Sequence, residues 1–137
     1  MGRNPFNDSF SQIIARMQVF ASQILELKNI ELSFEADEKI KTIKVPLQYR
    51  SELFMIFKEA INNLAKYSNA DHASVRLYKI NKIFFLEVKD NGIGFNMQSV
   101  TGGNGLRNMK ERAKNLNGKL TVLSGNSGTK IILEFTT

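Results

Sequence analysis

Residues 83–105 read IFFLEVKDNGIGFNMQSVTGGNG, and this stretch decides the fold. Its first part, Ile83 to Asp90, is rich in β-branched and aromatic residues and predicts a strand. Asp90 ends that strand beside a glycine turn, where a carboxylate can accept a hydrogen bond from an amine and the backbone allows close approach. The second glycine cluster, Thr101 to Gly105, leads directly into a predicted helix, whose N-terminus favours phosphate. Each glycine segment alone could be a surface turn, so the interpretation depends on their order.

The predicted helix before this stretch carries a polar stripe. It begins near Pro46, runs to about Tyr67, and buries an apolar arc on one side. Glu59, Asn63 and Lys66 fall about one turn apart on the other side, so their polar groups can converge on one ligand. An amide oxygen suits a Mg²⁺ ion that already carries phosphate oxygens, and a lysine suits phosphate charge. Taken alone, the same stripe could be a solvated helix face.

The rest of the chain alternates between helical and strand periodicity. The predicted elements are a helix from Asp8 to about Leu27, a strand from Ile30 to Phe34, an exposed connection over 35–44 with a short strand near 43–45, strands 73–80 and 83–90 joined by a tight turn at Asn81, a helix over 106–117 that stops at Gly118, and a closing hairpin of strands 120–123 and 130–135 around a loop at 124–128. Together they predict one α+β fold, a two-layer α/β sandwich in which helices cover one face of a mixed sheet.

Composition limits the classes of protein to which the chain can belong. Its 137 residues, 42% hydrophobic and 23% charged, suit one soluble globular domain. The absence of cysteine excludes a disulfide framework and a thiolate metal site, and fits a reducing, cytoplasmic setting. The net charge is +6, but basic residues are spread along the chain, so no nucleic-acid partner is expected. No apolar run is long enough for a bilayer span or a signal peptide, so no membrane contact is expected either.

Four segments resemble the nucleotide-binding boxes of one family. Glu59–Ser68 resembles the N box of bacterial sensor histidine kinase catalytic domains, and Asp90–Phe95 resembles their G1 box. Gly103–Ala113 resembles the G2 box with its following helix, and Gly128-Thr129 resembles the terminal Gly-Thr. The resemblance covers about residues 30–137 and implies the ATP-binding α/β sandwich shared by gyrase, heat-shock chaperones, histidine kinases and MutL (the GHKL or Bergerat fold). The run that begins at Leu106 is most similar to kinases that serve LuxR-type response regulators.

The resemblance implies a role for each site residue. Asn63 would coordinate Mg²⁺, Lys66 would contact phosphate, and Glu59 would polarise an incoming imidazole or support the metal shell. Asp90 would receive the adenine amino group, with Thr129 supporting it through its hydroxyl or a water. The remaining contacts with ATP or ADP are expected from Gly92 and Gly94 at the base, from Gly103 and Gly105 in a lid over the phosphates, and from Leu106.

By the same resemblance, the chain would transfer the γ-phosphoryl group of ATP to a histidine on a separate dimerisation domain and so serve a response regulator. That helical hairpin is missing here. Residues 1–29 would be either the domain's first helix or the tail of the hairpin, and 30–137 would be the catalytic domain. The only histidine, His72, is expected in a surface loop and not as the acceptor. Tyr67 stands where the family usually has histidine. Two alternatives remain: an anti-sigma-factor serine kinase of the same superfamily, and a non-catalytic scaffold that binds nucleotide or nothing.

Overall fold

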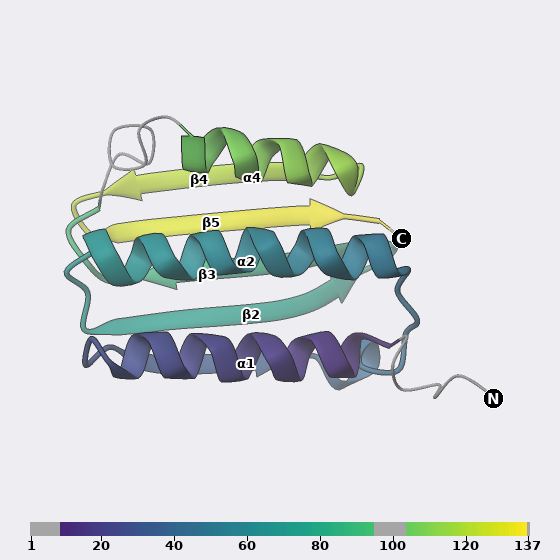
Figure 1. Ribbon diagram of the computed structural model, residues 1–137, viewed down its shortest axis with the longest axis horizontal. Coiled ribbons are helices and arrows are strands. Elements are labelled where there is room, and N and C mark those ends of the chain that lie inside the picture. The colour runs from purple at the N-terminus through teal and green to yellow at the C-terminus, as the bar shows by residue number, and fades with distance from the viewer. Residues whose placement is uncertain (1–8, 95–103, 137) are drawn as a thin grey trace.

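One layer of helices covers one face of a five-stranded sheet (Figure 1). The computed structural model describes residues 9–94 and 104–136. The strand order is β1-β2-β3-β5-β4, with β1 parallel to β2 and every other neighbouring pair antiparallel. The elements are α1 (Phe10–Glu26), β1 (Glu31–Ala36), the 3₁₀ turn η2 (Glu38–Ile40), α2 (Leu47–Tyr67), β2 (His72–Ile80), β3 (Ile83–Asp90), α4 (Asn104–Asn115), β4 (Lys119–Gly125) and β5 (Gly128–Phe135). The predicted α+β sandwich with a mixed sheet is therefore confirmed.

Strand alternation decides which side chains face the helices. Every second residue of β3, from Phe84 to Asp90, is buried, and so is every second residue of β5 from Thr129 to Phe135. Because side chains alternate across a strand, all of these lie on one face of the sheet. The opposite face carries residues such as Glu87, which is only half buried. The sheet therefore has one apolar face, and α1, α2 and α4 cover it.

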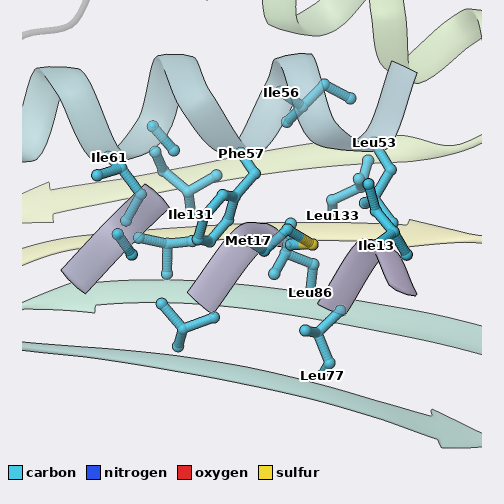
Figure 2. Packing of buried hydrophobic residues seen from close by; sticks show 14 of the residues in the cluster. Ile13, Met17, Leu53, Ile56, Phe57, Ile61, Leu77, Leu86, Ile131 and Leu133 are labelled. Carbon is cyan, nitrogen blue, oxygen red and sulfur yellow. The ribbon is translucent and has the colours of Figure 1, made fainter. Parts of the chain in front are cut away.

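The two longest helices supply the other half of the core (Figure 2). In α1 the buried side chains recur every three or four residues, and Met17 is fully buried. In α2 the fully buried Phe57 points into the same cluster, toward Ile131 and Leu86 of the sheet. Full burial of one such aliphatic or aromatic side chain contributes about 1.5–3 kcal/mol. Within the described ranges, no helix has both the length and the apolar character needed to cross a membrane.

Several predicted boundaries are wrong in detail. Strand β1 continues to Ala36, and the connection after it contains a 3₁₀ turn with Ile40 buried, so it is not simply exposed. In place of a strand at 43–45 there is a single antiparallel bridge between Ser9 and Lys44. Helix α4 begins at Asn104, before the predicted start at Leu106, and the strands of the closing hairpin run on into the loop predicted at 124–128. Polar side chains at the ends of these helices and strands interrupt the hydrophobic pattern from which the boundaries were predicted. The backbone hydrogen bonds continue there because they do not depend on side-chain polarity.

Candidate functional site

Buried polar side chains gather at one end of the sheet. Of the five polar residues that are buried among those described, four lie where α2 and β3 end and β5 begins. These four are Asn63, Ser68, Asp90 and Thr129. In Figure 1 this is the left-hand end of the sheet. Because buried polar groups are costly unless they find hydrogen-bond partners, this cluster is the candidate for a ligand site.

Asp90 is the centre of this cluster. It is the last residue of β3 and is only 3% exposed. Its Oδ1 accepts hydrogen bonds from the backbone N–H of Gly92 at 2.9 Å and of Thr129 at 3.3 Å. Burial raises the pKa of the Asp90 carboxyl, and the two backbone donors partly oppose that rise. Both bonds use Oδ1, so Oδ2 is the oxygen that can accept from an amine of a ligand.

Glycines allow three chain segments to meet around Asp90. A Cβ on Gly92 would lie 2.0 Å from the Ser68 carbonyl oxygen at the end of α2. A Cβ on Gly128 would lie 2.0 Å from the Asp90 carbonyl oxygen, and Gly128 also has a φ of +126°. Gly94 has a φ of +77° and approaches the carbonyl of Gly125 in the β4–β5 hairpin in the same way. Any larger residue at these positions would push the segments apart.

Thr129 on β5 is held in place by a residue of the neighbouring strand β4. Its hydroxyl lies 2.8 Å from the Ser124 hydroxyl, and the two residues are paired across β4 and β5. Thr129 is 3% exposed, so its backbone N–H and side chain are both fixed beside Asp90. A cavity of about 220 Å³ lies here, with Asp90, Ser124 and Thr129 in its lining. The larger groove of about 430 Å³ between α1 and α2 contains none of the four buried polar residues in its lining, so it is not the candidate site.

Asn63 on α2 is a buried amide that lacks a partner. It is 3% exposed, and its Nδ2 makes no hydrogen bond with any described residue. Leaving such a group unsatisfied costs about 1–3 kcal/mol, so a bound group that satisfies it would stabilise the protein. Rotation of the amide by half a turn puts Oδ1 in the place of Nδ2. The residue therefore fits a ligand of either polarity, including a Mg²⁺ ion that takes oxygen ligands.

Four other predicted site residues lie on α2 and α4. Glu59 is half buried one turn before Asn63 on α2, and Lys66 is exposed near the end of the same helix. Gly105 is buried and Leu106 half buried, and both lie in the first turn of α4, so Gly105 is helical and not part of a loop. Gly103 and the predicted lid over Phe95–Asn104 lie outside the described residues, apart from the Asn104 backbone that starts α4.

The predicted position of His72 is wrong. His72 is not a surface-loop residue but the first residue of β2, and it is partly buried. Its Nε2 lies 3.3 Å from the Ser33 hydroxyl on β1, because the two strands are parallel neighbours. The polar turn before it, residues 68–71, obscured the strand start. His72 is thus held by the sheet, on a different strand from Asp90.

Sequence reasoning missed two hydroxyl residues of the site. Ser68 is fully buried, donates to the Leu64 carbonyl at 2.7 Å, and accepts from the Ala70 N–H at 3.1 Å. Ser124 supports Thr129 from the neighbouring strand. A serine after the last turn of a predicted helix was a usable signal for Ser68. No such signal existed for Ser124, because its pairing depends on the register of the hairpin.

Comparison with known proteins places this site in a family. The sequence model of the family described as "Histidine kinase-, DNA gyrase B-, and HSP90-like ATPase" matches residues 48–137. This match includes α2, both glycine segments and the terminal hairpin. The Sensor protein VraS of Staphylococcus aureus (strain COL) is 36% identical over 95 residues, which is 68% of this chain. Those residues make up only 27% of VraS, so the chain spans about a quarter of the curated relatives it matches.

Solved structures agree on the fold. The histidine kinase domain of the blue-light-activated histidine kinase from Erythrobacter litoralis EL346 superposes with a TM-score of 0.76 at 20% identity, covering 90% of this chain and 60% of that one. The full-length kinase ShkA, in complex with AMPPNP, superposes with a TM-score of 0.77 at 18% identity, covering 94% of this chain and 30% of that one. The chain belongs to the histidine kinase-, DNA gyrase B- and HSP90-like ATPase family.

Proposed function

We propose that this domain binds Mg·ATP and is the catalytic domain of a sensor histidine kinase. The observation that carries the proposal is the Asp90 carboxylate, buried at a strand end and held by the N–H groups of Gly92 and Thr129. A fixed buried acceptor of this kind suits the amino group of adenine. Guanine presents a carbonyl at the equivalent position of its ring and would leave the carboxylate unpaired, which is costly. AMPPNP, which the structural relative ShkA binds, is an adenine nucleotide.

The phosphate end of the nucleotide would lie along α2. Asn63, with its unpartnered amide, would offer an oxygen to Mg²⁺, and exposed Lys66 would contact phosphate. Mg²⁺, when bound, neutralises charge on the phosphates during transfer. Half-buried Glu59 would then orient the incoming imidazole or support the metal shell. Gly103, Gly105 and Leu106 would border the phosphates, with Gly105 and Leu106 acting from the N-terminus of α4.

The reaction would be transfer of the γ-phosphoryl group to a histidine on a separate dimerisation domain, with a LuxR-type response regulator downstream. Such a kinase domain would work in the cytoplasm. We further propose that α1 belongs to the catalytic domain and is not the tail of a dimerisation hairpin. Its side chains Phe10, Met17 and Leu25 are fully buried in the same core as α2 and the sheet. The catalytic domain would then begin near Phe10, not at residue 30.

The domain should not phosphorylate itself. In-line transfer requires the acceptor nitrogen close to the γ-phosphate, whereas His72 is bound by Ser33 at the start of β2. With γ-labelled ATP, we expect no acid-labile label on the chain alone and strong label on an added histidine-containing hairpin from the parent kinase. Acid treatment distinguishes phosphohistidine from phosphoserine.

Three outcomes would count against the proposal. Acid-labile label on the chain alone, lost in His72→Gln, would make His72 the acceptor. Acid-stable label on a serine-bearing antagonist protein, with none on the hairpin, would favour an anti-sigma-factor kinase. Nucleotide binding without any label on the hairpin would favour a non-catalytic scaffold.

A further inference from the structure

The two halves of the proposed nucleotide site lie on different segments of the chain. Asp90 ends β3, while Asn63 lies on α2, and the turn of residues 68–71 joins α2 to β2. A nucleotide can contact both only if this turn and the glycine turn after β3 are held in a fixed relation. Misplacement by about 1 Å is enough to cost a site much of its binding or activity. The contacts that join the two turns therefore determine the geometry of the site.

The side chain of Asn91 joins them. Its Oδ1 accepts hydrogen bonds from the backbone N–H of Asp71 at 3.1 Å and of His72 at 3.0 Å. Its Nδ2 donates to the Asp71 carboxylate at 2.6 Å. The two accepted N–H groups determine which end of the amide is oxygen, so the orientation is settled by the network itself. Asn91 thus makes three side-chain bonds to Asp71 and His72, where the turn enters β2, although it is an exposed residue.

Backbone contacts next to Asn91 continue this connection to α2. The N–H of Ile93 donates to the Ser68 carbonyl at 3.0 Å, and Gly92 packs directly against the same carbonyl. Ser68 in turn bonds back into α2 through the Leu64 carbonyl, next to Asn63. The turn after Asp90 is therefore tied to the end of α2 by the bond of Ile93 to Ser68, and to the start of β2 by the side chain of Asn91.

We propose that Asn91 is a positioning residue of the nucleotide site, which holds Asp90 in register with the C-terminal half of α2. This inference rests on the function proposed above. The Asn91 amide supplies both the acceptor for two N–H groups and, from its other end, the donor for the Asp71 carboxylate. Aspartate at 91 would keep the acceptor but would place two carboxylates in contact. Exchange of the two side chains, Asp71→Asn with Asn91→Asp, would restore one donor and one acceptor across the same gap.

The exchange provides the test. Titration calorimetry with Mg·ADP should show binding about tenfold weaker for Asn91→Ala and at least as weak for Asn91→Asp. Asp71→Asn alone should change the affinity little, since Asn91 can still donate to an amide oxygen. The double variant should recover most of the wild-type affinity. Asn115→Ala, an exposed asparagine at the end of α4 away from the site, is the matched control and should bind like wild type.

Hydrogen exchange separates positioning from general stability. The backbone amide of Ile93, which bonds to Ser68, should exchange faster in Asn91→Asp and slow again in the double variant, while amides in the middle of β3 stay protected. The inference is overturned if Asn91→Ala binds Mg·ADP like wild type, or if the double variant stays as weak as Asn91→Asp. It is also overturned if affinity falls only in proportion to global unfolding. Wild-type protein that fails to bind Mg·ADP at all would instead refute the proposed function.

Discussion

The two ends of the sheet are built from opposite kinds of residue. At one end, on the right in Figure 1, Phe10, Phe84 and Phe135 pack ring against ring, with centroids 4.9 to 6.4 Å apart. All three are at most 3% exposed. At the other end, Asp90 and Thr129 occupy the equivalent inward positions of the same two strands, β3 and β5. One sheet face therefore changes from phenyl groups to a carboxylate and a hydroxyl over the length of a strand.

The difference shows how stability and binding are divided in this domain. Burial of aromatic rings is favourable without any ligand, so the phenyl end stabilises the fold by itself. At the polar end the protein satisfies only some of the buried hydrogen-bonding groups. The Nδ2 of Asn63 lacks a partner among the described residues, and the Asp90 carboxyl is buried. The remaining hydrogen-bonding capacity of this end is available to a ligand. Substitutions at the two ends should therefore separate loss of stability from loss of binding.

The largest expected effect is on stability, at the phenyl end. Phe84→Ala should lower the free energy of unfolding by about 3–5 kcal/mol, because it leaves a cavity between Phe10 and Phe135. Under conditions where the variant is folded, its affinity for ADP should match wild type. Urea unfolding and calorimetry measure the two quantities.

The neighbouring residue provides the control for that substitution. Phe85 lies on the opposite sheet face and is half buried. Its ring stacks on that of Tyr78, with the two ring centroids 5.0 Å apart. Phe85→Ala should cost no more than about 2 kcal/mol. If Phe84→Ala weakened ADP binding in the folded protein, the two ends would not be independent.

A smaller loss of stability is expected from Gly92→Ala at the polar end. The added methyl group would meet the Ser68 carbonyl oxygen at 2.0 Å, so the backbone must move at a cost of about 1–3 kcal/mol. Nucleotide binding should weaken as well, because Asp90 shares that turn. Gly125→Ala is the matched control, since nothing lies within 4 Å of its added Cβ, and it should change unfolding by less than about 0.5 kcal/mol. Equal effects of the two substitutions in urea unfolding would contradict the close approach.

Asn63→Ala should separate metal binding from stability. We expect about tenfold weaker binding of Mg·ATP and a smaller change for ATP in EDTA, because the variant would lose the proposed ligand of Mg²⁺. The free energy of unfolding without ligand should stay within about 1 kcal/mol of wild type, since the buried Nδ2 has no partner to lose. The same loss of affinity with and without Mg²⁺ would identify Asn63 as a packing residue.

The smallest effect concerns the pH dependence of stability. Burial raises the pKa of Asp90, so the folded protein binds a proton at this site more readily than the unfolded chain. The ionised carboxylate therefore destabilises the ligand-free fold at pH 7. This penalty shrinks once the pH falls below the raised pKa of Asp90 and is gone below the pKa of the unfolded chain. Asp90→Asn should be at least as stable as wild type at pH 7, and any gain in its free energy of unfolding should shrink as the pH falls. Urea unfolding at several pH values would contradict this if the variant were less stable at pH 7.

Local patterns predicted most of the fold. The alternation along β2 and β3, the turn at Asn81, which has a φ of +55°, and the apolar arc of α2 all gave correct elements. Asp90 and Asn63 were found because their residue types stand out at a strand end and on a helix face. Asn63 is buried, although the helix periodicity predicted it on the polar side of α2.

Contacts between distant residues could not be predicted in this way. Asn91 and Asp71 are separated by 20 positions, and their pairing follows only from the antiparallel register of β2 and β3. The contact of Ser124 with Thr129 likewise needs the tight hairpin that places Gly125 opposite Gly128. Strand ends at polar residues such as His72 were missed for the same reason, since backbone pairing and not hydrophobic pattern determines them.

Recognition of adenine by Asp90 can be measured in one calorimetric comparison. Wild-type protein and Asp90→Asn are titrated with ATP and with GTP, both in excess Mg²⁺. The wild type should bind ATP at least about tenfold more tightly than GTP, because a buried acceptor facing a carbonyl costs 1–3 kcal/mol. Asp90→Asn should lose most of its affinity for ATP and the preference with it, while remaining folded. Equal affinities of the wild type for ATP and GTP, or undiminished ATP binding by Asp90→Asn, would contradict the account.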